Sequence, residues 1–348
     1  MAEYAHLSTP DPDLVQALKA MSQMPRMTDF VTGRAAMKTG LLSHVQRKLK
    51  PQLPPDSEYE VQDYMIDTGD GSGAQVLARS VVPRKNTPDE KFPLLFWIHG
   101  GSWSMGSADM DDYQMRITSV KLRIAVVNCE YRLAPEHPFP IGLNDCHAVL
   151  KHVASNPEKF SAELSKGFII AGSSAGGNLS AVLSHRVRDD TFFKERGVSL
   201  TGQALLVPIV IHREAYPELP EDYRSRLLSL GSITNAPGLT REDGDLAFAS
   251  YKAPPTDPNM SPLLFPSHKG LPPAFIQVCG LDPVRDDGLL YERVLKADGV
   301  ETKLIVYPGA PHWVEYWFPH KQVGKKFRQD FVDGIKWLLD FSSKDSTV

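Results

Sequence analysis

The sequence contains few cysteines, no long apolar run and no excess of basic residues, and each shortage excludes a class of protein. Three cysteines among 348 residues, odd in number and widely spaced, fit neither a disulfide framework nor a zinc site. No apolar stretch approaches the roughly 18 residues that a membrane span needs. The N-terminus lacks the basic start and apolar run of a signal peptide. We therefore expect a cytoplasmic protein that has no membrane span.

The charge balance excludes a further class. Lys and Arg together number 38 and Asp and Glu 42, so the formal net charge is −4. A protein that binds nucleic acid usually has an excess of basic side chains, and this chain has a mild acidic excess instead. We therefore do not expect nucleic acid as a partner. Hydrophobic residues make up 42% and charged residues 23%, which is an ordinary globular composition. A chain of this length buries enough surface to fold without a disulfide or a structural metal.

Short apolar segments recur along the chain and alternate with helical patterns. Such segments are typical of buried strands, and helices between them indicate a mostly parallel sheet with helices on both faces. The pattern therefore predicts an α/β fold. The expected strands lie near 58–66, 74–82, 92–101, 123–131, 166–177, 203–211, 273–280 and 302–308, and the expected helices include 142–155, 178–188, 284–298 and 325–342.

Two segments do not follow this alternation. Residues 212–262 are polar, carry several prolines and show no clear strand, which indicates an insertion between two strands. Residues 1–50 precede the first expected strand. We expect these two segments to form a second layer over one end of the sheet, while residues 51–211 and 263–348 form the core.

The sharpest local motif is the sequence G-S-S-A-G at residues 172–176. It follows the apolar run 168–171 directly and precedes a helical pattern, which is the context of a nucleophile elbow. Small residues flank Ser174 because a strand-to-helix turn of this kind is sharp, and the helix N-terminus favours developing negative charge. The alternative is a tight glycine turn without catalytic meaning, and the strand before and helix after the motif argue against it.

A second motif, H-G-G-S-W at residues 99–103, ends an earlier apolar run. Acyl transfer builds an oxyanion that backbone N–H groups must face, and glycines let the backbone approach closely. This is the H-G-G type of loop that accompanies a nucleophile elbow. We interpret the backbone of the loop as functional and His99 as a side chain that pins the loop.

A nucleophilic serine needs a base and an acid that orients the base, in the chain order serine, acid, histidine. After residue 212 the sequence contains the histidines His268, His312 and His320. His312 is the favoured base because it follows the expected strand 302–308, where a loop meets the sheet edge. Asp282 follows the preceding expected strand in the same way and is the favoured acid.

Asp282 also has a structural interpretation. The pair Asp282-Pro283 could begin the next helix, with the aspartate as N-cap and the proline at the first helical position. Asp286 and Asp287 would then lie on that helix. We favour Asp282 over these two as the acid because it alone lies at the strand edge.

Four blocks occur together in order, namely HGGSW, YRLAPEHPFP at 131–140, GSSAGGNLS at 172–180, and DPVRDDG at 282–288 followed by GAPHW. With them the chain resembles the hormone-sensitive-lipase-like branch of the α/β-hydrolases over roughly residues 90–315. The resemblance implies an α/β-hydrolase fold whose helical cap is built from the two irregular segments. It also implies that Ser174 is the nucleophile, Asp282 the acid and His312 the base. The oxyanion donors would be the backbone N–H groups of Gly100, Gly101, Ser102 and Ala175.

The resemblance further implies a serine carboxylesterase that needs no cofactor or metal. Its substrates would be small-molecule esters, which are either esters of short acyl groups or acetylated or lactone-containing metabolites. Trp103 and Trp313 would line the substrate pocket, and methionines of the N-terminal segment would close over Ser174, namely Met21, Met24, Met27 and Met37. Members of the family commonly pair through the last strand and its adjoining helix, so the resemblance allows a homodimer.

Three positions depart from the family pattern, and one of them is Val284, where leucine is usual. The family often has a third glycine where this chain has Ser102, which keeps a backbone N–H, and an acidic residue where it has Ser173. Two other functions on the same scaffold stay open. One is a lyase or cyclase that uses the pocket without hydrolysis. The other is a small-molecule receptor, although receptors of that kind lose a triad member and this chain keeps all three.

Overall fold

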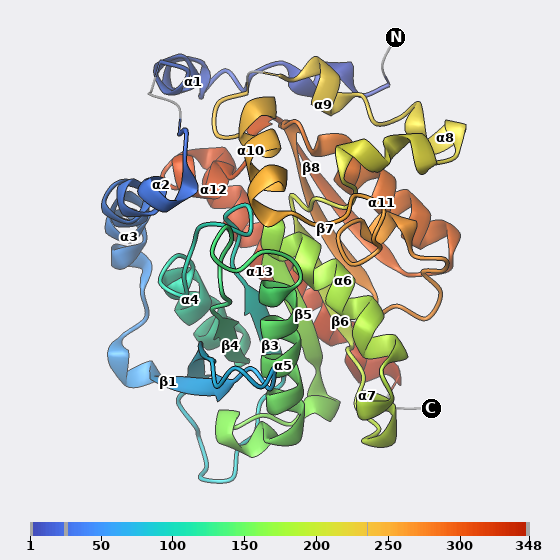
Figure 1. The fold of residues 1–348 in the computed structure, drawn as a ribbon. Coiled ribbons are helices and arrows are strands. Elements are labelled where there is room, and N and C mark those ends of the chain that lie inside the picture. The colour runs from blue at the N-terminus through green and yellow to red at the C-terminus, as the bar shows by residue number, and fades with distance from the viewer. Residues whose placement is uncertain (1–2, 24–26, 235, 346–348) are drawn as a thin grey trace.

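A sheet with the strand order β1-β2-β4-β3-β5-β6-β7-β8 forms the centre of the computed structural model, which describes residues 3–23, 27–234 and 236–345 (Figure 1). β1 and β2 pair antiparallel, β2 pairs antiparallel with β4, and all other neighbours pair parallel. The expected α/β fold class is confirmed, and every expected strand is present. The strands are β1 Tyr59–Asp67, β2 Gln75–Pro83, β3 Leu94–Ile98, β4 Ala125–Cys129, β5 Phe168–Ser173, β6 Gly202–Leu206, β7 Ala274–Leu281 and β8 Thr302–Pro311.

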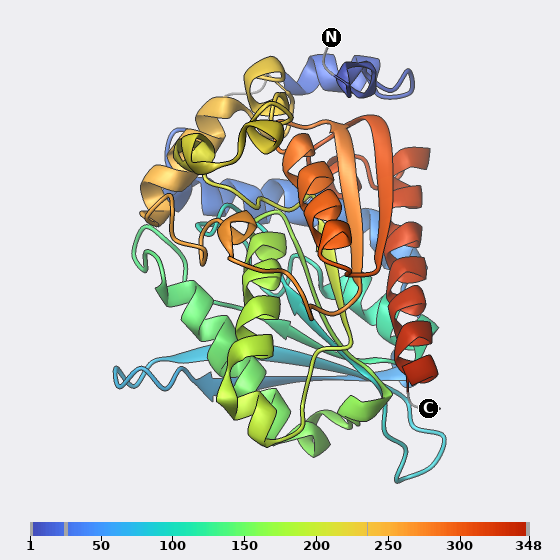
Figure 2. The same ribbon diagram turned by 90° about the vertical axis from the view of Figure 1, so that its right-hand side faces the viewer.

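Helices cover both faces of the sheet because its central strands are apolar on both sides (Figure 2). Along β3, Leu94 and Phe96 pack with the cluster that includes the helices α5 and α6, whereas Leu95 and Trp97 pack with the cluster that includes α4 and α13. All four side chains are buried. The helices of the first face are α5 Ile141–Ser155, α6 Ala175–Asp189 and α11 Arg285–Ala297, and those of the second are α4 Asp112–Leu122 and α13 Gln322–Asp345, while the short α7 Thr191–Glu195 follows α6.

The N-terminal segment and the insertion lie together at one end of the sheet (Figures 1 and 2). An ion pair of 3.1 Å between Glu3 and Arg226 joins the two segments. Arg34 connects the N-terminal segment to the core through a hydrogen bond of 2.8 Å to Ser104 O. The helices at this end are α1 Val15–Met21, α2 Phe30–Met37, α3 Ser43–Leu49, α8 Glu221–Arg224, α9 Ser229–Ser232, α10 Arg241–Tyr251 and α12 Val314–Trp317.

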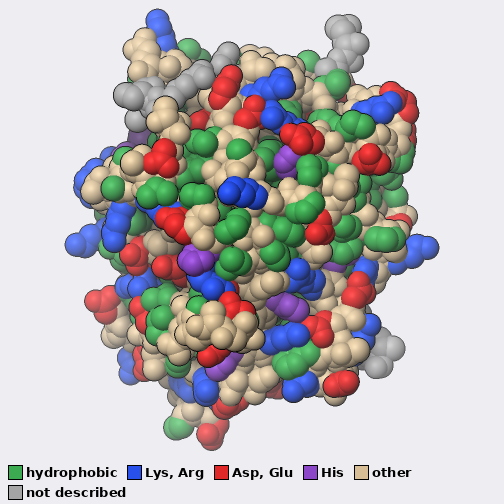
Figure 3. Space-filling model, in the orientation of Figure 1, with side chains coloured by type: hydrophobic (Ala, Val, Ile, Leu, Met, Phe, Trp, Pro, Cys, Tyr) green, Lys and Arg blue, Asp and Glu red, His purple; other side chains and the backbone are tan. Residues whose placement is uncertain are grey.

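The outer surface carries charges of both signs. On the face drawn in Figure 3, Lys and Arg side chains are interspersed with Asp and Glu side chains and with hydrophobic ones. Within the described ranges, none of the helices is both long and apolar enough to cross a membrane. β8 lies at one edge of the sheet with α13 beside it, and pairing of two copies through these elements stays a prediction.

Candidate active site

Ser174 lies at the sharp turn between β5 and α6. Its φ of +56° is in the left-handed region, which costs a non-glycine residue about 1–3 kcal/mol. The turn is compressed on both sides, since a Cβ on Gly172 would collide with Gly176 O and a Cβ on Gly176 would collide with Ile98 O. Close packing therefore requires glycine at both flanking positions. The strained turn between them directs the serine hydroxyl away from the strand.

The structure brings Ser174, His312 and Asp282 into one chain of hydrogen bonds. His312 Nε2 lies 2.9 Å from Ser174 Oγ, and His312 Nδ1 lies 2.7 Å from Asp282 Oδ2. Asp282 is fully buried, and the other two side chains are almost fully buried. A proton on Nδ1 that is donated to the carboxylate leaves Nε2 as an acceptor for the serine hydroxyl. The arrangement can therefore remove a proton from Ser174.

Asp282 does not begin the following helix. The N-cap of α11 is Val284, whose N–H donates to Asp282 Oδ1 at 3.0 Å, while Oδ2 faces the histidine. Asp287 instead accepts a backbone N–H from the loop that follows β6, and Asp286 accepts two backbone N–H groups at the start of α9. The structure thus separates the three aspartates and places only the first one against His312.

The other two candidate histidines lie in other surroundings. His268 Nδ1 is 3.3 Å from His185 Nε2, and the ring of His320 lies edge-on to His44 with 6.1 Å between centroids. Burial lowers the pKa of His185 to about 2 and that of His268 to about 4, so both rings are neutral near pH 7. Neither His268 nor His320 is a hydrogen-bond partner of Ser174.

The glycine loop after β3 packs tightly against the elbow. A Cβ on Gly100 would lie 2.7 Å from Ser173 O and 2.8 Å from the ring of Trp313. Gly101 has a φ of +117°, and a Cβ there would collide with Met105 O. The backbone of this loop consequently approaches the serine turn more closely than any other residue type would permit.

Two further backbone groups adjoin Ser174. Ser102 has a φ of +56° and lines the cavity beside Ser174, so it adopts the left-handed conformation that a glycine would take more easily. Ala175 is the first residue of α6, and the first N–H groups of a helix face a region that favours negative charge.

His99 braces the glycine loop. Its Nδ1 donates to Gly100 O at 2.7 Å, and its ring stacks on Tyr131 with 4.4 Å between centroids. The Tyr131 hydroxyl donates to His99 O at 3.3 Å. Burial lowers the pKa of His99 to about 4, so the ring is neutral near pH 7. These contacts agree with our interpretation of His99 as a side chain that pins the loop.

A cavity of about 30 Å³ lies beside Ser174, which is room for one or two waters. Trp103 lines it and stacks on Tyr251 with 4.6 Å between ring centroids. Among the described residues, Trp313 is not part of the lining, because its ring lies against Gly100. The insertion and its flanks supply most of the other lining side chains, which are Ile209, Ile211, Arg213, Tyr216, Leu230, Leu239, Thr240, Ala247, Phe248, Pro283, Val284 and Asp287.

The N-terminal segment borders a second, larger cavity. This cavity of about 320 Å³ is lined by α2 and α3 on one side and by β2 and residues 106–110 on the other. Met37 contributes to this cavity, whereas no described residue of the first 50 lines the cavity at Ser174. Met21, Met27 and Met37 therefore do not line the cavity at Ser174, and Met24 lies outside the described residues, so a role of the N-terminal segment as a cap over Ser174 stays a prediction.

Comparison with known proteins identifies the family. A family model described as alpha/beta hydrolase fold matches residues 95–315, which is more than half of the chain. The chain belongs to this family. The hydrolase is a member of the hormone-sensitive-lipase-like branch, as its motifs predict, and relatives named as esterases and carboxylesterases show that it is an enzyme acting on ester bonds.

Three similar proteins cover most of the hydrolase. It is 36% identical to an AB hydrolase superfamily protein of Schizosaccharomyces pombe over 96% of this chain and 95% of the relative. It is 33% identical to versiconal hemiacetal acetate esterase of Dothistroma septosporum over 87% of both chains. The third is vibralactone cyclase, whose sequence is 37% identical to this one. Its crystal structure superimposes on this chain over 97% of both chains with a TM-score of 0.90.

Two of the three departures from the family pattern, at Ser173 and Ser102, have structural consequences in the hydrolase. Ser173 is fully buried, and its hydroxyl has no hydrogen-bond partner among the described residues. A charged side chain there would need a partner that this environment does not supply. Ser102 keeps the positive φ of the position, so the loop conformation is retained without a third glycine.

Sequence reasoning missed the residues that surround the catalytic motifs in the hydrolase. The cavity lining from the insertion carries no motif, and its spacing gave no signal. Glu315, three residues after His312, is buried close to the site although nothing in the sequence marked it. Within the described ranges, no group of three or more His, Cys, Asp and Glu side chains is placed to hold a metal ion.

Proposed function

We propose that this hydrolase cleaves small carboxylic esters through an acyl-enzyme formed on Ser174. The hydrogen-bond chain from Ser174 through His312 to Asp282 is the observation that carries the proposal. As Ser174 Oγ attacks the carbonyl carbon, His312 takes its proton and the carboxylate holds the resulting imidazolium. The backbone N–H groups of residues 100–102 and Ala175 would meet the negative charge that develops on the carbonyl oxygen.

The second half of the cycle uses the same groups. His312 returns the proton to the leaving alcohol as the ester C–O bond breaks, and the acyl group stays on Ser174. A water then loses a proton to His312 and adds to the acyl carbon, and the serine leaves with that proton as the carboxylic acid is released. The sum is addition of one water across the ester bond, with no net change in the enzyme.

The surroundings of Ser174 support a short acyl group. The cavity beside it is small and mostly apolar, and Trp103 and Phe248 narrow it. The acetate ester named for the Dothistroma septosporum relative is of this size. We therefore propose acyl groups of about two to six carbons, with the insertion and the N-terminal segment acting as a cap that excludes water on one side.

Labelling of the serine tests the proposal. A fluorophosphonate probe is expected to modify Ser174 in the native protein, and Ser174→Ala is expected to lose both the label and about 10⁴–10⁶ of kcat on p-nitrophenyl acetate. Ser173→Ala is the matched control, since the neighbouring hydroxyl is buried and faces no base. Labelling that persists in Ser174→Ala would refute the assignment.

A cyclase function is the second candidate, and the similarity to vibralactone cyclase favours it. In that reaction a hydroxyl of the substrate, rather than water, would attack the acyl-enzyme, and the product would be a lactone. The same groups would serve, because His312 takes the proton from either nucleophile. Mass spectrometry of the products from a hydroxy-ester separates the two, since hydrolysis adds one water and cyclisation does not.

A further inference from the structure

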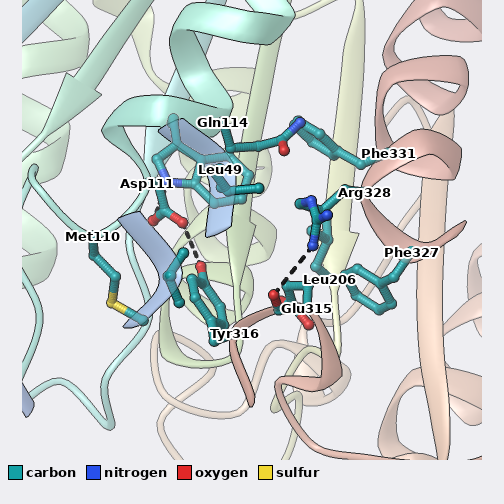
Figure 4. A pocket seen from close by; sticks show the side chains of 12 residues that line it. Leu49, Met110, Asp111, Gln114, Leu206, Glu315, Tyr316, Phe327, Arg328 and Phe331 are labelled. Carbon is teal, nitrogen blue, oxygen red and sulfur yellow. Dashed lines mark hydrogen bonds between the residues drawn. The ribbon is translucent and has the colours of Figure 1, made fainter. Parts of the chain in front are cut away.

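A third cavity, distinct from the two described above, lies behind the candidate site on the α13 face of the sheet. It has a volume of about 30 Å³, and Glu315 of α12 reaches into it (Figure 4). Glu315 is 6% exposed, and neither of its carboxyl oxygens has a hydrogen-bond partner among the described residues. A buried carboxyl without a donor is costly in its charged form, so this side chain requires an explanation.

The cation nearest to this carboxyl does not pair with it. Arg328 of α13 is 8% exposed, lines the same cavity and donates to the backbone oxygens of Pro319 at 2.7 Å and Glu315 at 3.4 Å. No ion pair within 4.0 Å joins Arg328 to the Glu315 carboxyl in the described part of the chain. Both residues line the cavity, whose volume of about 30 Å³ is enough for a water, and a buried water needs two or more polar partners.

The other acidic side chain of the cavity is already satisfied. Asp111 accepts a hydrogen bond of 2.7 Å from Trp97 Nε1 and another from the Tyr316 hydroxyl. α3 contributes Val45 and Leu49, which are apolar. Among the described residues that line this cavity, Glu315 is therefore the carboxyl without a hydrogen-bond donor, and Arg328 is the side chain that carries a positive charge.

Charges on the neighbouring elements oppose ionisation of Glu315. Burial is the largest cause that raises the pKa of Glu315 to about 8, and the carboxylates of Asp111 and of Asp282, which follows β7, add to it. The backbone N–H of Glu315 itself and the Arg328 guanidinium lower this pKa. The thiol of Cys279 on β7 also lies within electrostatic reach of Glu315, and burial raises its pKa. Near pH 7 the Glu315 carboxyl accordingly holds a proton and can donate it to a water.

The position of Glu315 links this cavity to the catalytic groups. α12 begins directly after His312 and Trp313, so Glu315 lies one helical turn beyond the histidine. The adjacent Tyr316 holds the ring of Trp313 edge-on at 5.3 Å, and that ring covers Gly100 of the oxyanion loop. Movement of α12 would therefore disturb the histidine and the loop together.

We propose that Glu315 is a positioning residue that holds a proton, is bridged by water to Arg328, and fixes α12 and thereby His312. Ionisation of Glu315 in alkaline solution breaks this arrangement, because the charged carboxyl is drawn to Arg328 and repelled by Asp111. The proposal rests on the proposed esterase function, since it concerns the same histidine. It predicts an alkaline loss of activity that belongs to a residue outside the catalytic chain.

The test compares kcat/KM for p-nitrophenyl acetate between pH 5 and 10 in wild type, Glu315→Gln and the control Glu60→Gln, which changes an exposed side chain on β1. Wild type and the control are expected to lose about 10–100-fold in kcat/KM on the alkaline side, the scale of a misplaced catalytic group. Glu315→Gln, which keeps a neutral donor, is expected to retain activity within about threefold at pH 7 and to lack the alkaline loss. An unchanged alkaline limb in Glu315→Gln would overturn the proposal.

A stability measurement separates this proposal from the function proposed above. The pKa of Glu315 is raised on folding, so the native state binds more protons and its stability falls as pH rises from about 4.5 to about 8. The melting temperature of Glu315→Gln is expected to fall less than that of wild type between pH 6 and 9. Equal falls would overturn the role of Glu315 even if Ser174 is labelled, whereas absence of labelling with the expected stability difference would overturn only the esterase function.

Discussion

Replacement of Asp282 by Asn is the sharpest test of the candidate site, because the change removes one charge and keeps the shape. Asp282 Oδ1 accepts the Val284 N–H at 3.0 Å and Oδ2 faces His312 Nδ1 at 2.7 Å. The Asn amide oxygen will stay with the backbone N–H, which turns the NH₂ group toward His312. Since two donors cannot face each other, His312 must place its proton on Nε2, where it can no longer accept the proton of Ser174.

The expected loss follows from that tautomer. A base in the wrong tautomer costs about 10⁴ in kcat in the serine protease that is the general precedent, and each factor of ten corresponds to about 1.36 kcal/mol of barrier, or about 5 kcal/mol in all. The free energy of unfolding should change by only about 1 kcal/mol, the net value of one hydrogen bond. If Asp282 merely capped a helix, both effects would be small, since Asn caps as well.

The assay is kcat on p-nitrophenyl acetate, with the melting temperature recorded on the same samples. Asp287→Asn is the matched control. Asp287 is almost as buried and accepts the Val210 N–H, and burial raises the pKa of its carboxyl, but this side chain does not face His312. Its kcat should stay within about tenfold of wild type. A decrease in Asp287→Asn as large as in Asp282→Asn, or a kcat of Asp282→Asn within tenfold of wild type, would refute the reasoning.

Three other outcomes are expected. Folding lowers the pKa of His185 and His268 from 6.5 to about 2 and about 4, so the unfolded state takes up protons first and stability is lost as pH falls below about 6.5. The melting temperature should therefore drop between pH 7 and 5, and a constant value would contradict the buried neutral histidines. Gly100→Ala places a Cβ 2.7 Å from Ser173 O, which should displace the loop and lower kcat by about 10²–10³, whereas an unchanged kcat would argue against an oxyanion role. Trp103→Ala enlarges the cavity and should move the optimum of a p-nitrophenyl ester series to longer chains, and an unmoved optimum would exclude this residue from substrate selection.

The sequence by itself was sufficient for features that depend on local backbone geometry. The apolar runs predicted the six strands β3 to β8, since a buried strand must be apolar over its few residues, and two strand-like segments around a Gly/Asp turn predicted β1 and β2. The G-S-S-A-G turn predicted the elbow, and the structure shows why its glycines are needed. Chain order and strand ends were enough to single out His312 and Asp282, because parallel strands end at one edge of the sheet.

Tertiary structure decided the features that depend on contacts between distant residues. The sequence left Asp282 with two roles, and only the start of α11 at Arg285 removed the helix-capping one. The placement of Met37 at a second cavity, and not in the lining of the cavity at Ser174, depends on how α2 docks on the core. The state of Glu315 depends on Arg328 beside it and on Asp111, which is about 200 positions away in the chain. Burial and electrostatics are sums over such neighbours, so no local pattern contains them.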